Sequence, residues 1–221
     1  MDYRLLSICI CTLVLSATGF FYGTKFCKKH NYLIGIEWYL LAISSANFMV
    51  YELTHSAISW GGVLFLDTFS RAFGIPIATT AGLMVLTHRF RPTVLNDVAL
   101  FLIPAAATLF LLTDAMATVL PYFLLGMWTI FTLYLLYFSY QLLKFGERLH
   151  ALGMTLAALL NQAIATLYDF YKIPGDETNI VLNFYTIALL VWAYLTVQTY
   201  YSYCALERAM AATGEKAAPA A

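Results

Sequence analysis

Residues 5–24, LLSICICTLVLSATGFFYGT, form an uncharged and mostly apolar stretch that decides the class of fold. A helix needs about 20 such residues to cross the ~30 Å hydrocarbon core of a bilayer. Of the 221 residues in the chain, 62% are hydrophobic and only 11% are charged. A soluble domain of this size could not bury so much apolar surface. The sequence therefore predicts an integral membrane protein.

Further long apolar stretches follow this one, separated by short polar segments. Each must be helical, because an open strand would leave backbone N–H and C=O groups unpaired in lipid. We therefore predict an all-α integral membrane protein with seven transmembrane helices in one domain, residues 1–206, and a short flexible cytoplasmic tail, residues 207–221. The expected spans are Leu5–Thr24, Tyr32–Leu53, Val63–Thr87, Val98–Ala117, Pro121–Leu143, Leu149–Tyr168 and one within Thr178–Leu206.

The distribution of Lys and Arg predicts the orientation, because cytoplasmic loops carry an excess of these residues. With the N-terminus outside, the inner side holds Lys25, Lys28, Lys29, Arg89, Arg91, Lys144, Arg148, Arg208 and Lys216. The outer side then holds only Arg4, Arg71 and Lys172. We therefore expect an outer N-terminus, a cytoplasmic C-terminus and a location in the bacterial inner (cytoplasmic) membrane.

Composition and spacing argue against several classes of function. The net charge is zero, so we expect the lipid bilayer as partner and no nucleic acid. The four cysteines lack the spacing of a metal site and are interpreted as packing residues. No histidine pair lies well inside the membrane to hold haem, and the last span has no Lys to bind retinal. We find no catalytic motif, so we expect neither a cofactor nor a metal, and an enzyme is the less favoured class.

Charged and polar residues gather toward the outer ends of the second and third predicted spans. Ionisable groups inside membrane helices are costly and mark candidate functional sites. Their helical spacing predicts an outward-facing polar cavity lined by Glu52, His55, Asp67 and Arg71, with Asp169 from the sixth span and Asn183 from the seventh. In the alternative interpretation, Asp67 and Arg71 only pair with each other and the other acids are solvated among the lipid headgroups.

Three polar residues lie deeper in the predicted spans. Glu37 is more than one turn inside the second span, where it either serves a functional site or extends to the cytoplasmic face. Asn161 and Gln162 lie near the middle of the sixth span. Such amides either join helices by hydrogen bonds of roughly 0.6 kcal/mol or contribute to the binding of a translocated solute. Pro76 and Pro104 are expected to kink the third and fourth spans.

One segment resembles part of a known family. Residues 65–78, FLDTFSRAFGIPIA, are similar to the Asp…Arg-x-Phe-Gly segment of bacterial queuosine-precursor transporters. The resemblance covers one span of seven, and the later spans do not follow that family's pattern. A transporter fold is what this resemblance implies for the segment.

Two classes of function fit these observations. The polar cavity, the amides in mid-span and the helix-breaking prolines favour a small-solute or ion transporter or channel-like protein. Its substrate- or ion-binding candidates are Glu37, Glu52, His55, Asp67, Arg71, Asn161, Gln162 and Asp169. The short loops and tail also fit a sensor or an accessory subunit of a larger membrane complex, whose partners would be other membrane proteins.

Overall fold

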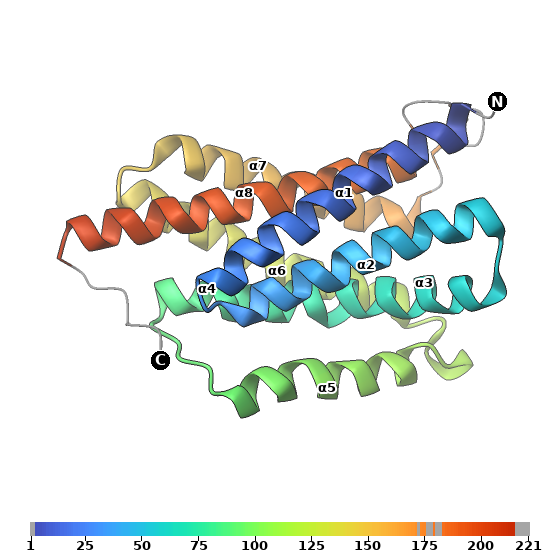
Figure 1. Ribbon diagram of the computed structural model, residues 1–221, viewed down its shortest axis with the longest axis horizontal. Helices are drawn as coiled ribbons and strands as arrows, with labels where there is room; N and C mark the ends of the chain where they lie inside the picture. The colour runs from blue at the N-terminus through green and yellow to red at the C-terminus, as the bar shows by residue number, and fades with distance from the viewer. Residues whose placement is uncertain (1–2, 172, 176–178, 180–182, 215–221) are drawn as a thin grey trace.

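The computed structural model describes residues 3–171, 173–175, 179 and 183–214, and the regular elements among them are all helices. Figure 1 shows their arrangement as a bundle of long helices that run side by side. In chain order they are α1 (Tyr3–Lys28), α2 (Tyr32–Thr54), α3 (Ala57–Phe69), the π-helix η1 (Ser70–Thr79), α4 (Thr80–Thr87), α5 (Val94–Leu111), the 3-10 turn η2 (Asp114–Met116), α6 (Leu120–Lys144), α7 (Arg148–Phe170) and α8 (Phe184–Ala212).

Six helical segments of the described chain are long and apolar enough to cross a membrane. They are α1, α2, the continuous rod α3–η1–α4, α5, α6 and α7. The predicted class, a helical membrane protein, is therefore confirmed. The helix α8 has 29 residues but is not one of the six, because Gln198 and several tyrosines make it more polar. Seven spans and the orientation of the termini stay predictions.

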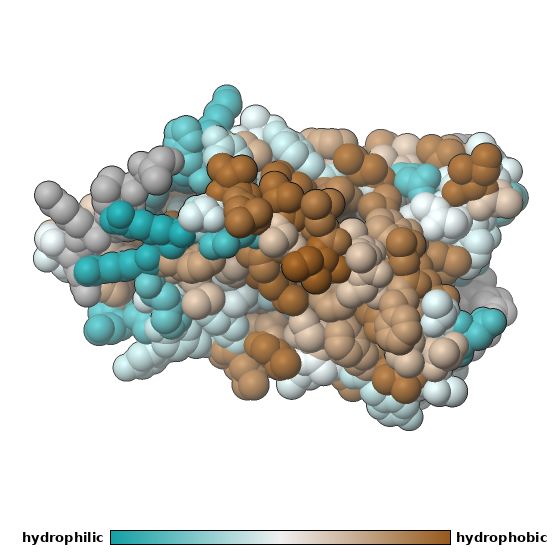
Figure 2. All heavy atoms as spheres, turned by 90° about the horizontal axis from the view of Figure 1, so that it is seen from below, coloured by the Kyte–Doolittle hydropathy of each residue, from teal (hydrophilic) through white to brown (hydrophobic). Residues whose placement is uncertain are grey.

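The surface of the bundle is suited to lipid. Figure 2, which views the side that carries α5, shows hydrophobic side chains over the middle and much of the right half, and hydrophilic ones gathered mainly at the left end. The helix α5 buries few of its side chains, and its exposed large apolar residues are Val94, Leu95, Val98, Leu102, Ile103, Leu109 and Phe110. Such a continuous apolar surface would be a liability in water but is the expected outer layer of a membrane helix.

Small residues let α1 and α2 approach closely. A Cβ atom at Gly19 would lie 2.8 Å from the Trp38 carbonyl oxygen, and one at Gly23 would lie 2.9 Å from the Gly35 carbonyl oxygen. Across the same contact, Ser45 Oγ donates to the Thr12 carbonyl at 2.9 Å. Close backbone approach at small residues is how membrane helices associate, since lipid provides no hydrophobic force between them.

Two boundaries differ from those predicted. The segment 56–62 is not a connection: Ser56 caps a helix that begins at Ala57, and its Oγ accepts from Ser59 N at 3.5 Å. At the other end, α8 continues to Ala212, so residues 207–212 belong to a helix rather than to a flexible tail. Residues 215–221, which include Lys216, lie outside the described part of the chain, as do Lys172 and Thr178.

An ion pair joins the extended end of α8 to the turn after α1. Lys29 Nζ lies 2.5 Å from Glu207 Oε2. Burial lowers the pKa of the Lys29 ammonium, but the hydrogen bond to Glu207 and nearby negative groups outweigh it, so the pKa is above its ordinary value. This pair connects the last turns of α8 to the turn after α1.

Candidate functional site

A cavity of about 110 Å³ opens among α1, α2, α3, η1, α7 and α8. That volume has room for several water molecules or a small solute. Its lining residues are Leu15, Leu41, Ser44, Ser45, Phe48, Trp60, Val63, Leu64, Asp67, Ser70, Arg71, Ile75, Tyr168, Tyr185, Ala188, Leu189 and Trp192. Most of these side chains are apolar, and the charged ones come from consecutive turns of α3 and η1.

The charged side chains that line the cavity, Asp67 and Arg71, belong to a cluster of three, whose third member, Asp169, lies just outside the lining. Arg71 Nη1 lies 3.4 Å from Asp67 Oδ2 one turn earlier, and Arg71 Nη2 pairs with Asp169 Oδ2 on α7. The Tyr168 ring stacks on the guanidinium, 3.7 Å from Cζ to the ring centroid, and its hydroxyl donates to Asp67 at 3.5 Å. The Arg71 side chain is only 5% exposed. One guanidinium between two carboxylates leaves this cluster with a net negative charge.

Aromatic rings form much of the remaining wall. They are Phe48, Trp60, Tyr168, Tyr185 and Trp192. Phe48 and Tyr185 lie 5.6 Å apart between ring centroids, and Tyr168 and Trp192 are stacked at 6.4 Å. The rings come from α2, α3, α7 and α8, so the packing of these helices sets the shape of the cavity.

Two polar atoms at the cavity have no hydrogen-bond partner in the described part of the chain. One is Ser70 Oγ, in a residue that is 2% exposed, and the other is Trp192 Nε1. Buried polar groups are almost always satisfied by protein or by water, because leaving them unpaired costs about 1–3 kcal/mol. Trp192 Nε1 is therefore available to a solute or to water in the cavity, whereas Ser70 also neighbours the Glu37 carboxyl group.

Glu37 lies next to this cavity rather than at the surface. Its side chain is fully buried, and neither carboxyl oxygen has a hydrogen-bond partner among the described residues. It faces η1, where Ser70 is a neighbour and where a Cβ at Gly74 would overlap its carboxyl group. The side chain does not extend to the cytoplasmic face, which removes one of the two alternatives. Ser70 therefore borders both Glu37 and the cavity.

The segment opposite Glu37 has an unusual backbone. Residues 70–79 form a π-helix that contains Pro76. Proline has no N–H to donate, and its ring clashes with a carbonyl of the preceding turn in an α-helix, so the backbone departs from regular α geometry there. The π geometry is rare in proteins, and where it occurs it is often found at functional sites. Here it carries Arg71 and Ser70 at the cavity and Gly74 against Glu37.

The structure corrects the predicted cavity at Glu52 and His55, because neither residue lines it. His55 ends α2 in a left-handed conformation with φ 50°, and its exposed ring packs on Tyr51, 5.8 Å between centroids. Glu52 is half-buried and lies near Cys9 of α1. Both side chains therefore lie outside the cavity lining that contains Asp67. Asn183 is also absent from the lining: it caps α8, accepting from Thr186 N at 3.1 Å.

The two amides of α7 are not part of the cavity either. Gln162 joins α7 to α6, because its Oε1 accepts from Thr132 at 2.8 Å and its Nε2 donates to Thr129 at 3.2 Å. Asn161 is buried, and its Nδ2 donates to the Ala157 carbonyl of the preceding turn at 2.8 Å. The structure therefore favours helix association for Gln162, whereas the hydrogen bond of Asn161 lies within α7 and leaves its buried Oδ1 without a partner among the described residues.

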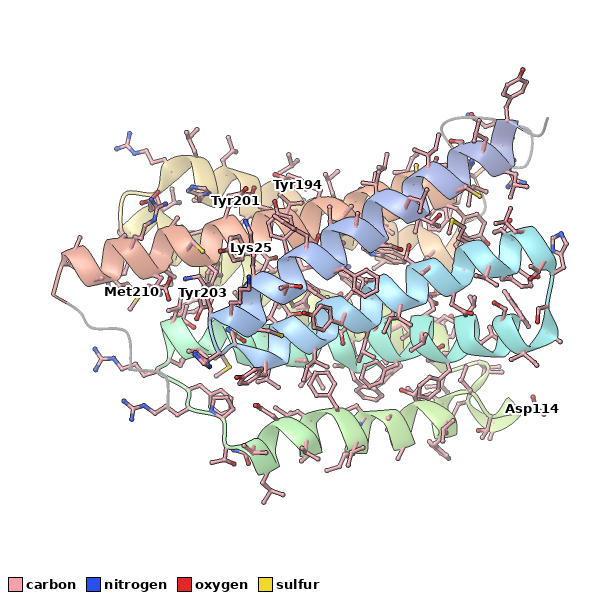
Figure 3. The ribbon with its side chains drawn as sticks, in the orientation of Figure 1. Lys25, Asp114, Tyr194, Tyr201, Tyr203 and Met210 are labelled. Carbon is pink, nitrogen blue, oxygen red and sulfur yellow. The ribbon has the colours of Figure 1, made fainter. Side chains whose placement is uncertain are left out.

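A second cavity, of about 220 Å³, lies at the opposite end of the bundle. Its lining residues are Thr87, Tyr137, Gln141, Lys144, Phe145, Leu206 and Met210. Figure 3 labels Met210 near this end and Asp114 near the other. Between Gly74 and Thr87, the rod is largely buried, with Ile75, Ala78, Leu83 and Leu86 almost inaccessible. Packed side chains therefore separate the two cavities.

Sequence reasoning missed part of this site. Tyr168 and Ser70 were not among the candidates, although each directly precedes one in the sequence, Asp169 and Arg71. An aromatic residue next to an acid near the end of a span is a usable signal. That five aromatic rings from four helices meet at one cavity cannot be predicted from a single sequence.

No protein-family model, curated protein or solved structure matches this chain. Within the described residues, no group of three or more His, Cys, Asp or Glu side chains is placed to hold a metal ion.

Proposed function

We propose that this chain is a small-solute or ion transporter of the bacterial inner membrane, with seven transmembrane helices. The observation that carries the proposal is the cavity beside a buried, unpaired carboxyl group at Glu37. An intramembrane ionisable residue with no oppositely charged partner is a functional candidate, because its burial is costly and the neutral Ser70 is the polar neighbour that the structure gives it.

The orientation in this proposal has the N-terminus outside and the C-terminus in the cytoplasm. The turns after α1, α4 and α6 and the end of α8 lie together at the left of Figure 1, and the N-terminus and the other turns lie at the right. The basic residues Lys28, Lys29, Arg89, Arg91 and Arg148 belong to the left end. The positive-inside rule supports this end as cytoplasmic. The cavity at Asp67 then opens toward the outside.

In the proposed mechanism, a solute enters the outer cavity, and Glu37 carries the coupling proton or cation. Ser70 is the link between them, since it lines the cavity and is a neighbour of the carboxyl group. The packed segment between Gly74 and Thr87 closes the path to the inner cavity in this conformation. If groups of helices rock about the outer cavity, that cavity would open to the cytoplasmic side, as alternating access requires.

The test is uptake into proteoliposomes that contain the purified full chain. Amino acids, sugars, nucleosides, carboxylates, amines and inorganic ions are each offered outside, and their internal content is measured over time. Transport predicts time-dependent accumulation of one class above the level of protein-free liposomes. Uptake at the protein-free level for every class contradicts the proposal.

A second candidate, an accessory subunit of a larger membrane complex, is favoured by a specific observation. The helix α5 leaves a wide apolar surface uncovered, on which a membrane helix of a partner could pack. This candidate predicts that the chain, purified from its native membrane in mild detergent, migrates with stoichiometric partner proteins. A transporter is expected to migrate alone or as copies of itself.

A further inference from the structure

We infer that the outer cavity binds a small organic cation with an apolar body, such as an alkylated ammonium compound. The inference rests on the proposed function and names the class of its substrate. It is drawn from three independent properties of the cavity: its charge, its aromatic wall and its buried polar groups.

The charge of the cavity favours a cation. Asp67 and Arg71 line the cavity, and Arg71 also pairs with Asp169, which lies just outside the lining. Two negative groups and one positive group sum to one negative charge. In a largely apolar cavity, a ligand of opposite charge restores neutrality, whereas an anion would add to the imbalance.

The single positive group is not available to an anion. Arg71 donates to a carboxylate on each side, and the face of its guanidinium is covered by Tyr168 at 3.7 Å. An anionic ligand would have to displace a carboxylate from a charge-assisted hydrogen bond, which is stronger than a neutral one. The positive charge therefore serves to hold η1 against α7 rather than to bind a substrate.

The aromatic wall favours a cation with an apolar body. Aromatic faces attract ammonium groups through the ring quadrupole, and cages of such rings are the usual site for alkylated ammonium. Phe48, Trp60, Tyr185 and Trp192 line the cavity in addition to the ring that covers Arg71. A small hydrated metal ion would gain little from rings in place of oxygen ligands, because hard cations prefer oxygen.

The buried polar groups give the ligand a direction. Ser70 is buried at the cavity, next to the Glu37 carboxyl group, and its hydroxyl can donate to an oxygen of a ligand or accept from a ligand hydroxyl. Trp192 Nε1 can only donate, so it fits an oxygen of the same ligand. A ligand with a cationic end and a hydroxyl or carbonyl oxygen would use both.

The test measures equilibrium binding by isothermal titration calorimetry to the full chain in nanodiscs. The cationic probes are methylammonium, tetramethylammonium and choline. The matched probes are the uncharged carbon analogue of choline, in which a tert-butyl group replaces trimethylammonium, and the anion pivalate. We expect at least one cation to bind at least tenfold more tightly than both matched probes. Equal affinity across the charge classes, or no binding of any cation, overturns the inference.

Two substitutions locate the binding to this cavity. Phe48→Leu removes one ring and is expected to weaken cation binding by about threefold to tenfold, whereas Phe20→Leu on the exposed side of α1 leaves it unchanged. Asp67→Asn removes a carboxylate and is expected to weaken binding of the cation more than binding of the neutral analogue. The exposed Asp114→Asn is the control and should leave both affinities unchanged. Because Phe48 is outside the ion cluster, it tests the site even if Asp67→Asn fails to fold. Unchanged binding in Phe48→Leu overturns the location.

The binding result separates this inference from the proposed function. Cation binding without uptake in proteoliposomes would contradict transport and leave the inference intact, as for a sensor. Uptake of a neutral or anionic solute with no cation binding would support transport and overturn the inference.

Discussion

Replacement of Arg71 by Ala is expected to destabilise the protein strongly. The guanidinium is the only positive group that the described residues place in contact with Asp67 and Asp169, so its loss leaves two carboxylates uncompensated. Removal of one partner of a buried pair costs roughly 3–5 kcal/mol. The Asp67 and Asp169 side chains are 23% and 20% exposed, so water can reach them, and we expect the lower end, about 3 kcal/mol.

The assay is reversible unfolding by SDS titration in mixed micelles, followed by the fluorescence of the tryptophans. The exposed Arg148→Ala is the control and should stay within about 0.5 kcal/mol of the wild type. In the Arg71→Ala background, Asp67→Asn together with Asp169→Asn should recover part of the loss, because no charge is then left unpaired. An Arg71→Ala protein as stable as the control would refute the reasoning and reduce the cluster to solvated surface charges.

Three further substitutions test other contacts. Gly74→Ala would place a methyl group on the Glu37 carboxyl and should cost about 1–3 kcal/mol, whereas Gly61→Ala, with open space around it, should be neutral or slightly stabilising. Gln162→Leu should cost about 0.6 kcal/mol in the SDS titration and leave solute uptake unchanged, since the amide only joins helices. Lys29→Ala should cost less than about 1 kcal/mol at neutral pH. Because the Lys29 pKa is raised in the fold, this stabilisation is present at neutral pH and is lost as pH rises through that pKa, which unfolding at alkaline pH would detect.

The class of fold could be predicted because long uncharged runs have one stable form in lipid. The helix boundaries that were predicted wrongly lie in segments whose polar or glycine-rich sequence resembles a loop but forms a helix. Ala57–Gly62 contains two glycines and a serine and therefore resembles a turn, but the Ser56 cap begins the helix there. Glu207 resembles the start of a polar tail, but it belongs to α8 and pairs with Lys29.

The candidate site could be predicted only in part, because rotation and neighbours of membrane helices are set by packing. Arg71 and Asp67 lie one helical turn apart, so their pairing follows from the spacing in the sequence. Its pairing with Asp169 joins residues far apart in sequence and requires η1 to lie beside α7. The helix α2 is apolar around most of its circumference, so its sequence does not determine that Glu37 faces Gly74 while Glu52 lies outside the cavity lining.

The most direct test of transport is proton movement that depends on Glu37. Proteoliposomes loaded with the pH dye pyranine receive the solute that accumulates in the uptake assay, and internal pH is recorded for the wild type, Glu37→Gln and the control Glu147→Gln. The described helices in contact with α2 carry charge at Asp67, Arg71, Glu207, Arg208 and the ends of α1. Glu147 lies on none of them, in the turn between α6 and α7, so the control leaves the surroundings of Glu37 and its neighbour Ser70 intact. We predict a solute-dependent pH change in the wild type and in Glu147→Gln that is lost in Glu37→Gln while the protein stays folded. An equal pH change in Glu37→Gln would contradict the account.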